Sequence, residues 1–368
     1  MNFYEKELNS LKRVGRLRSR VVHPKTLIDM ASNDYLGLAY NQTLLEKAYK
    51  RLSNYNSHSP KASMLVNGYH PLHKEFEEYI SKRTGFEDTI VVGSGFLANI
   101  SLIDALVRKG DLLVLDEEFH ASGIMASKLV KNIIFFKHND PNDLENILNK
   151  KTYKRVIVGV EGVYSMSGNI LNRDIINICD KHQAIMIIDE AHSSGVLGDK
   201  FLGIYDHYNI TPKSNHIKMA TLGKAIGSYG AYISASSHII EYLLNRGKPI
   251  IYSTAPSLFD ITLAHESYIY IEEHKKILKQ KRDTHIKSVK DILNKEINSL
   301  IMTLDIADNK KVIKLQKDIK EIGFLVGAIR EPTVKSAILR VILRTSIDEK
   351  RVKELLFYLK EQLFLSSF

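Results

Sequence analysis

Short apolar runs recur through the middle of the chain and alternate with longer stretches that are patterned like helices. These runs are rich in β-branched residues and lie at 89–93, 111–116, 132–136, 155–161, 184–190 and 217–221. Their length and composition favour buried parallel strands over helices. The intervening segments are long enough for crossover helices, so the pattern predicts an open α/β domain with a mostly parallel sheet.

The pattern changes after about residue 260. Residues 261–297 are charged, follow a helical repeat and contain no Gly or Pro, which predicts one long helix leaving the large domain. The remaining segments predict a smaller α+β domain, with strands at 324–329 and 337–343 and a terminal helix at 348–364. We therefore expect an N-terminal helical arm over residues 1–36, a large domain over 37–262 and a small C-terminal domain over 263–368.

The amino-acid composition mainly excludes certain classes of protein and of site. The chain of 368 residues is 44% hydrophobic and 26% charged, which excludes a disordered protein. Cys179 is the only cysteine, so neither an internal disulfide nor a zinc site built from cysteines can form. No secretory signal is present, and no apolar run approaches the roughly 20 residues of a membrane span. We expect a cytoplasmic protein without a membrane partner.

The chain is basic, with 52 Lys and Arg against 42 Asp and Glu and a formal net charge of +10. Nucleic acid, an anionic membrane or an acidic molecule could match this charge. The charge is diffuse and no recognition module is present, which argues against a nucleic-acid partner. One cluster stands apart near the N-terminus and consists of Lys12, Arg13, Arg16, Arg18 and Arg20.

Leu8, Leu11 and Leu17 recur within the same N-terminal segment at spacings compatible with one helical face. Two interpretations remain open. The segment is either an amphipathic helix that packs through its leucines, or it brings one of its arginines to an anionic substrate.

Polar residues and glycines gather directly after the predicted strands. In open α/β sheets, ligands bind outside the carboxyl ends of the strands. The residues at these positions are Gly95, His120, Ser165, Asp189 with His192, and Thr221 with Lys224. A structural protein has no evident reason to collect such side chains at one edge, so the sequence predicts a ligand site there.

Asp189 lies at the end of a very apolar run and is therefore expected to be buried, where an ionised carboxylate is costly without a partner. It could cap a helix or pair with an arginine, bind metal in the acidic box of a nucleotide-driven helicase, or meet the protonated ring nitrogen of a cofactor. The helicase interpretation requires a G-x-x-x-x-G-K-[ST] loop, which the chain lacks.

Other candidates each allow two interpretations. Lys224 is either a solvated lysine or an amine that forms a Schiff base with an aldehyde cofactor, with Gly223 allowing a close approach. His120 is either satisfied within the protein or stacks on a planar ring. GSGFLAN (93–99) is either a tight turn or a helix N-terminus that binds phosphate. HPLH (70–73) has no further ligand cluster, so we expect no metal.

Short motifs follow one another along the chain: ASNDYLGL (31–38), NGYHPLH (67–73), GSGFLAN (93–99), FHAS (119–122), EGVYSMSG (161–168), DEAHSSGVLG (189–198), TLGKAIG (221–227) and IYSTAP (251–256). In this order they resemble the α-oxoamine synthases, pyridoxal-phosphate enzymes of the aspartate-aminotransferase fold, also called fold type I. The likeness extends from about residue 30 to about residue 345. It implies pyridoxal 5′-phosphate as cofactor, a large domain with a mostly parallel sheet and a smaller α+β C-terminal domain.

The resemblance also implies a role for each candidate residue. Lys224 would hold the cofactor covalently, Asp189 would pair with its ring nitrogen, His192 would bind its ring hydroxyl and His120 would stack on its ring. The other cofactor-binding positions would be Gly95, Phe96, Ser165, Thr221 and, from the partner subunit of a dimer, Thr254. The substrate-binding positions would be His120, Asn33, Thr333, Arg340 and Arg18, with Arg340 binding the amino-acid carboxylate and with Arg16 or Arg20 as alternatives to Arg18.

Residues 327–334, GAIREPTV, resemble the biotin-pathway member of this family. That member condenses L-alanine with a pimeloyl thioester carried by coenzyme A or an acyl-carrier protein; the alternative joins glycine to acetyl-CoA. The family also implies a homodimer with shared active sites. Glu331 stands where the usual pattern has proline and Met64 where many relatives have arginine, so the acyl pocket departs from the family more than the cofactor residues do.

Overall fold

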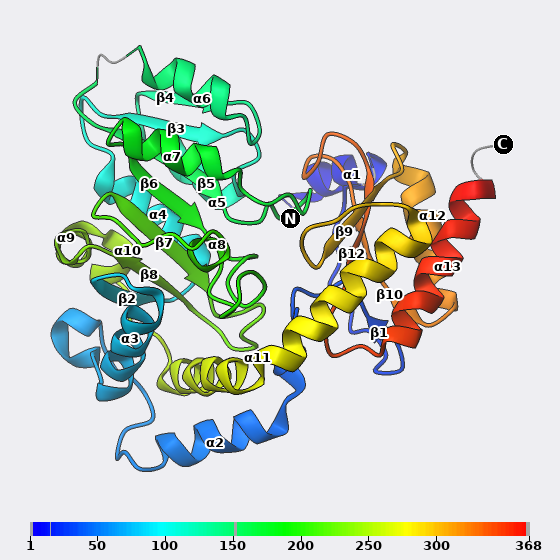
Figure 1. The fold of residues 1–368 in the computed structure, drawn as a ribbon, viewed down its shortest axis with the longest axis horizontal. Coiled ribbons are helices and arrows are strands. Elements are labelled where there is room, and N and C mark those ends of the chain that lie inside the picture. Colours follow the sequence, from blue (N-terminus) through cyan, green and yellow to red (C-terminus); the bar gives the residue numbers. More distant parts are fainter. Residues whose placement is uncertain (1–2, 15, 151–152, 366–368) are drawn as a thin grey trace.

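The computed structural model describes residues 3–14, 16–150 and 153–365. Its main layer is a seven-stranded sheet in the order β2-β8-β7-β6-β5-β3-β4 (Figure 1). The strands are β2 (Asp88–Val92), β3 (Leu112–Asp116), β4 (Ile133–Phe136), β5 (Val156–Glu161), β6 (Ile185–Asp189), β7 (His216–Thr221) and β8 (Ala231–Ala235). Within this sheet only β8 runs antiparallel to its neighbours, so the carboxyl ends of the other strands meet at one edge.

Alternate residues of these strands point to opposite faces and build two cores. On β6, Met186 and Ile188 join one cluster of buried side chains, while Ile187 joins the other. The face of Ile187 is covered by α4 (Gly95–Leu106), α5 (Ala121–Ser127), α9 (Ser237–Arg246) and α10 (Lys248–Ile251). The opposite face is covered by α3 (Pro71–Thr84), α6 (Pro141–Leu148), α7 (Arg173–Lys181) and α8 (Ile204–His207). Because both faces are covered, the central strands β3, β5 and β6 are apolar up to the acidic residue that ends each of them.

A smaller part of the molecule is built from both ends of the chain. Its antiparallel sheet has the order β11-β12-β9, and beside it β1 pairs with β10 in parallel. These strands are β1 (Ile28–Asp29), β9 (Ile301–Asp305), β10 (Phe324–Leu325), β11 (Gly327–Ile329) and β12 (Ile338–Ile342). The remaining helices are α2 (Gln42–Leu52), α11 (Leu258–Leu293), α12 (Asn309–Glu321), α13 (Glu349–Leu365) and two short turns, η1 (Leu38–Tyr40) and η2 (Met64–Gly68).

The long helix α11 joins the two parts of the molecule. It packs on α2 and α3 beside the large sheet and on α13 in the smaller part, as Figure 1 shows. Although it has 36 residues, neither α11 nor any other described helix contains an apolar stretch that could cross a membrane.

Most predicted elements are present. Each predicted parallel strand is found within one residue at either end, and the long and terminal helices are α11 and α13. The predicted strand at 324–329 is wrong in one respect, because Val326 divides it into β10 and β11, which belong to different sheets. The sequence pattern did not predict β8, β9 or α12. The domain divisions at residues 36 and 262 stay predictions.

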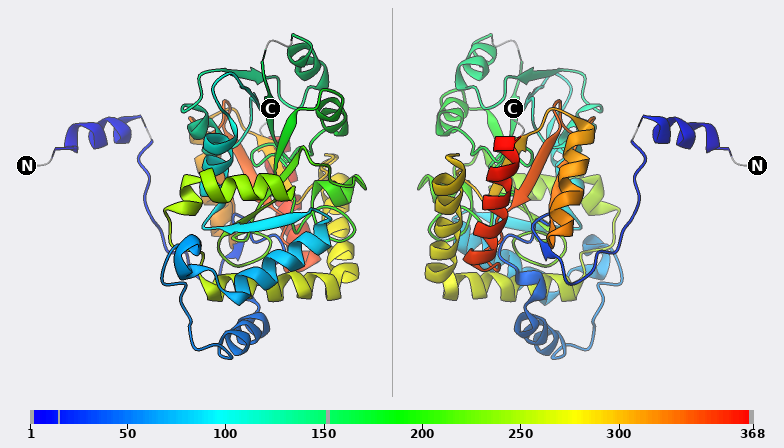
Figure 2. Two further views of the ribbon diagram at one scale, coloured as in Figure 1. Left: turned by 90° about the vertical axis from the view of Figure 1, so that its left-hand side faces the viewer. Right: turned by 90° about the vertical axis from the view of Figure 1, so that its right-hand side faces the viewer.

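The structure of the N-terminal segment excludes one of the two interpretations of its leucines. The helix α1 (Glu5–Arg13) ends before Leu17 and buries no side chain. Leu8, Leu11 and Leu17 are 47%, 41% and 48% exposed. The prediction that this helix packs through its leucines onto the rest of the chain is therefore wrong. Both views of Figure 2 show α1 standing away from the body of the molecule.

Candidate active site

The carboxyl edge of the large sheet brings two acidic residues side by side. Glu161 ends β5, Asp189 ends β6, and the two are paired in the register of these parallel strands. Both side chains project from the face that α4 covers, because strand residues alternate between faces. They are almost fully buried, at 2% and 4% exposure. We call Glu161, Asp189, His192 and Lys224 the strand-end cluster.

Asp189 is held as a hydrogen-bond acceptor without a cationic partner. Its Oδ2 accepts from Asn99 Nδ2 at 2.8 Å, and its Oδ1 accepts from the backbone N–H of Ala191 at 3.0 Å. The neighbouring buried carboxylate of Glu190 pairs with Lys218, whereas Asp189 makes no salt bridge within the described part of the chain. A buried carboxylate in this state favours a ligand that brings a positive charge.

Lys224 lies in the same cluster and is half-buried. Its Nζ is 2.7 Å from His192 Nε2, and His192 Nδ1 is 2.6 Å from the hydroxyl of Tyr35. Burial lowers the pKa of Lys224 to about 8, against the opposing effects of Asp189 and Glu161. Burial, and then the positive charge of Lys224, holds the pKa of His192 well below its ordinary value. An amine with a pKa of about 8 is partly unprotonated near neutral pH and can act as a nucleophile or a base.

Glu161 differs from Asp189 in its hydrogen bonds. Its Oε2 accepts from the backbone N–H of Ser165 at 3.1 Å, but Oε1 has no partner among the described residues. Burial, followed by the neighbouring Asp189, raises the pKa of Glu161 well above its ordinary value. The direction of this shift favours the protonated form of Glu161, which relieves the repulsion between the two neighbouring carboxyl groups.

His120 is connected to Asp189 through two other side chains. It caps the start of α5, where its Nδ1 lies 2.7 Å from Ser122 Oγ and accepts from the backbone N–H of Ser122 at 3.2 Å. Ser122 Oγ in turn accepts from Asn99 Nδ2 at 2.8 Å. Burial lowers the pKa of His120, and Lys224 adds to this effect while Asp189 opposes it. The direction of this shift favours the neutral imidazole beside the strand-end cluster.

The N-terminus of α4 offers room for an anion. Ser94 caps this helix, Gly95 is its first residue and Phe96 is 43% exposed. A Cβ on Gly95 would come no closer than 3.6 Å to Met219 and 3.8 Å to Thr221, so the chain itself does not require glycine here. The free N–H groups and the dipole of a helix N-terminus favour phosphate, and a ligand phosphate would account for the missing side chain.

Arg340 connects β12 of the smaller part to this edge. Its Nε donates to the backbone oxygen of Ser165 at 2.8 Å, and its Nη2 donates to Asn33 Oδ1 at 3.0 Å. The guanidinium is buried and forms no salt bridge with any described residue. Uncharged acceptors orient it without neutralising it, so it can bind a carboxylate.

Other predicted residues lie at exposed positions. Thr254 follows α10, and Thr333 lies between β11 and β12. Arg18 is exposed and has no hydrogen bond or salt bridge to a described residue. Arg16 instead reaches the segment of Thr333, where its Nη2 lies 3.3 Å from Glu331 Oε2. The roles of Arg18, Thr254 and Thr333 stay predictions.

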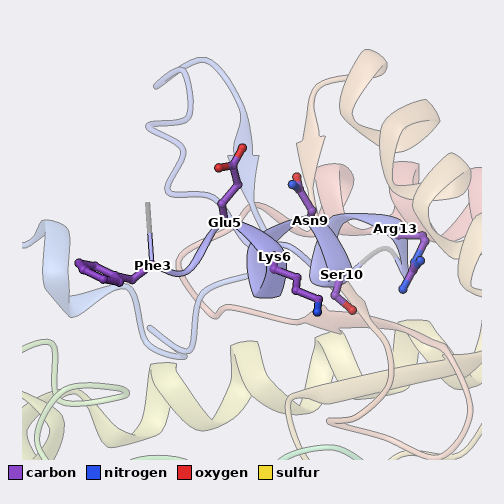
Figure 3. Close-up of a pocket in the computed structure, with 6 residues that line it drawn as sticks. All are labelled: Phe3, Glu5, Lys6, Asn9, Ser10 and Arg13. Atoms are coloured by element: carbon purple, nitrogen blue, oxygen red, sulfur yellow. The ribbon is translucent and has the colours of Figure 1, made fainter. Parts of the chain in front are cut away.

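A hollow beside α1 lies apart from this edge. Figure 3 shows the residues that line it, all from the N-terminal arm: Phe3, Glu5, Lys6, Asn9, Ser10 and Arg13. The side chains belong to an exposed helix and include no buried acid or base. We therefore assign the hollow no chemistry.

The sequence interpretation missed four side chains that complete the edge, namely Tyr35, Asn99, Ser122 and Glu161. Glu161 gave a signal, because an acidic residue ends the strand at 155–161 just as Asp189 ends the next strand. Asn99 and Ser122 gave none, since their contacts depend on how α4 and α5 pack on the sheet.

Comparison with known proteins supports the same fold. A model of the aminotransferase class I and II family matches residues 25–359. The chain belongs to the aminotransferase class I and II family. Among relatives in this family, the 8-amino-7-oxononanoate synthase of Helicobacter pylori strain 26695 is 43% identical over 357 residues, which cover 96% of this chain and 95% of that protein. The putative 8-amino-7-oxononanoate synthase of Aquifex aeolicus is 34% identical over 362 residues, with 95% of each chain covered.

Solved structures confirm the predicted architecture of this aminotransferase-family chain. An 8-amino-7-oxononanoate synthase from Francisella tularensis has a TM-score of 0.78 and 25% identity, covering 94% of this chain and 100% of that one. A serine palmitoyltransferase from Sphingomonas wittichii has a TM-score of 0.87 and 22% identity, covering 99% of both chains; at this identity it shows the fold alone. The predicted fold class and the resemblance to α-oxoamine synthases are confirmed.

Proposed function

We propose that this protein is a pyridoxal-phosphate-dependent 8-amino-7-oxononanoate synthase. It would convert L-alanine and a pimeloyl thioester into 8-amino-7-oxononanoate, carbon dioxide and free thiol, a step of biotin synthesis. The observation that carries the proposal is the position of two groups at one sheet edge, the buried Asp189, which forms no salt bridge with a described residue, and the half-buried amine of Lys224 with its lowered pKa. The Helicobacter relative, which aligns with nearly the whole chain, supports the choice of reaction.

The strand-end cluster fits this cofactor. Lys224 would hold it covalently, Asp189 would bind its protonated ring nitrogen, and the N-terminus of α4 at Gly95, with Thr221, would bind its phosphate. His192 would hydrogen-bond its ring hydroxyl, and His120 would stack on the ring. When bound, pyridoxal 5′-phosphate supplies an electron sink for a carbanion at the α carbon of the amino acid.

The chain's own groups then handle the substrate and its protons. Arg340, held by Asn33 and the oxygen of Ser165, would bind the carboxylate of L-alanine with a charge-assisted pair of about 1.5–3 kcal/mol. Lys224 Nζ would accept the α proton and return a proton to the same carbon after decarboxylation. Its pKa of about 8 keeps enough of the amine unprotonated for this task.

We also propose a cytoplasmic homodimer that shares its active sites. Thr254 is exposed, and no hydrogen bond joins it to the strand-end cluster within the described part of the chain, which suits a residue that serves the partner subunit. The exposed aromatic side chain of Tyr252, two residues before Thr254 and 82% exposed, suits an interface that a second copy covers.

A substrate panel tests the reaction. Purified protein loaded with pyridoxal 5′-phosphate is given L-alanine or glycine, each with pimeloyl-CoA, pimeloyl acyl-carrier protein or acetyl-CoA. We expect free thiol and a product with the mass of 8-amino-7-oxononanoate only with L-alanine and a pimeloyl donor. Thiol release with glycine and acetyl-CoA alone would assign the protein to the alternative member of the family and overturn the proposal.

A further inference from the structure

A chain of hydrogen bonds runs from Asp189 to His120 on the α4 face of the sheet. Asn99 Nδ2 lies 2.8 Å from both Asp189 Oδ2 and Ser122 Oγ, and Ser122 Oγ lies 2.7 Å from His120 Nδ1. Asn99 and Ser122 are 1% and 0% exposed, so bulk water cannot replace their partners. The direction of each hydrogen bond follows from the chemistry of these four groups.

Asp189 determines the orientation of the Asn99 amide. Oδ2 of Asp189 accepts a hydrogen bond from this amide, so the amide turns its NH₂ group toward Asp189. The second N–H of that group then points at Ser122. The opposite orientation would place Asn99 Oδ1 against the carboxylate. In the observed orientation Oδ1 has no partner among the described residues, a cost that the two N–H bonds offset.

Ser122 passes this direction on to His120. Because Ser122 Oγ accepts from Asn99, its hydroxyl proton is available to His120 Nδ1. The backbone N–H of Ser122 donates to the same nitrogen at 3.2 Å. Two donors that converge on Nδ1 require a lone pair there, so the neutral imidazole carries its proton on Nε2. Nε2 makes no hydrogen bond within the described residues and is left for a ligand.

We propose that Asn99 and Ser122 are positioning residues that fix His120 in the tautomer protonated at Nε2. Through them, the accepting oxygen of Asp189 decides which ring nitrogen of His120 donates a hydrogen bond. The tautomer follows from the geometry of this chain alone. Its use rests on the proposed function, in which the ring lies on the cofactor and Nε2–H donates to an oxygen of the substrate.

Nitrogen-15 NMR of the histidine rings in the full-length protein reads the tautomer directly, because protonated and unprotonated ring nitrogens resonate far apart. The chain has 14 histidines, and the signals that disappear in His120→Asn identify His120. We expect an unprotonated Nδ1 and a protonated Nε2, both with and without pyridoxal 5′-phosphate. A protonated Nδ1 in the wild-type protein would overturn the proposal.

Two variants break the connection at different points. Ser122→Ala removes the hydroxyl but keeps the backbone N–H, so the tautomer protonated at Nδ1 should become measurable. Asn99→Leu frees the Ser122 hydroxyl to rotate and should have the same effect; either variant suffices if the other does not fold. The matched control is Ser127→Ala. It removes a hydroxyl of the same helix that donates a hydrogen bond to the backbone oxygen of Ile124. His120 signals that are equally unchanged in Ser122→Ala and Ser127→Ala would refute the role of Ser122.

Kinetics separates this inference from the proposed function. We expect Ser122→Ala to lower kcat/KM for L-alanine by about two- to tenfold, the effect of one hydrogen bond. Its cofactor absorbance should not change, because the contacts of Asp189 remain. An inactive wild-type protein with the expected tautomer would refute the proposed function and leave the tautomer assignment standing. An active enzyme whose kcat/KM does not respond to Ser122→Ala would refute the use of Nε2–H.

Discussion

The strand-end cluster and the contact between Arg16 and Glu331 hold their charges in different ways. In the cluster, Asp189 is buried and both of its oxygens accept from fixed N–H groups. Arg16 and Glu331 have side chains that are 46% and 56% exposed and meet through a single contact at 3.3 Å. Burial makes an unmatched charge costly, whereas water can replace either partner of an exposed pair.

This difference separates the two ends of the proposed substrate site. At the cofactor end, each group is at least half-buried and has a defined neighbour, so the chemistry depends on single side chains. At the acyl end, the arm and the segment around Glu331 are exposed, and the family resemblance predicts a departure there, at Glu331. Substitutions in the cluster should therefore stop the reaction, while those at the acyl end should adjust affinity.

The largest effect should come from Lys224→Ala. The variant removes the amine that would hold the cofactor and move the α proton, so we expect kcat to fall by about a thousandfold or more, as for the loss of a general base or nucleophile. The visible absorbance of the bound cofactor should change at the same time. Steady-state thiol release and absorbance spectra measure both. Lys248→Ala, which removes an exposed lysine paired with Asp104, is the matched control. A Lys224→Ala enzyme that kept its turnover would show that the strand-end cluster does not depend on single side chains, and the contrast with the exposed acyl end would be wrong.

Sequence alone indicated this part of the site because its signals are local. Asp189 ends one strand and Lys224 closely follows another, and an ionisable side chain at such a position is a local signal of a ligand site. The positions of Asn99 and Ser122 depend on helix packing, which no spacing along the chain reveals. The large sheet was predictable for the same reason, since buried parallel strands are continuous apolar runs.

The elements that were missed lack such signals. β8 has the sequence AYISA, whose small residues pair antiparallel with β2 and β7 and resemble a loop more than a strand. Val326 is as apolar as its neighbours, so nothing in the sequence marks the change from β10 to β11. α1 has leucines on one face, but a helix buries such a face only if a partner covers it.

A smaller effect tests the carboxyl pair of the cluster. Folding raises the pKa of Glu161, so the folded state binds the proton of this carboxyl group more tightly than the unfolded state does. Stability from this group is therefore present at low pH and is lost as pH rises from about 4.5 toward the raised pKa. Glu161→Gln mimics the protonated form, so the wild type should lose stability relative to this variant as pH rises.

Denaturant unfolding of both proteins across this pH range measures the difference. The control is Glu117→Gln, which removes an exposed carboxylate near the same sheet edge. A wild-type protein that gained stability over Glu161→Gln with rising pH would show that Glu161 is ionised in the fold. The cluster would then hold two neighbouring negative charges, contrary to the arrangement described above.

The smallest effect belongs to Arg16 and Glu331. An exposed ion pair contributes about 0.2–1 kcal/mol, which corresponds to a change of about 1.4- to fivefold in affinity. Glu331→Gln should free Arg16 for the anionic acyl donor and lower KM for pimeloyl-CoA within that range. Arg16→Gln should raise KM, and both effects should shrink as salt increases. Lys12→Gln, which removes another exposed cation of the arm, is the control. A double-mutant cycle with a coupling above about 1.4 kcal/mol, a tenfold effect, would mean that the bound substrate buries this pair, and the acyl end would then behave like the strand-end cluster.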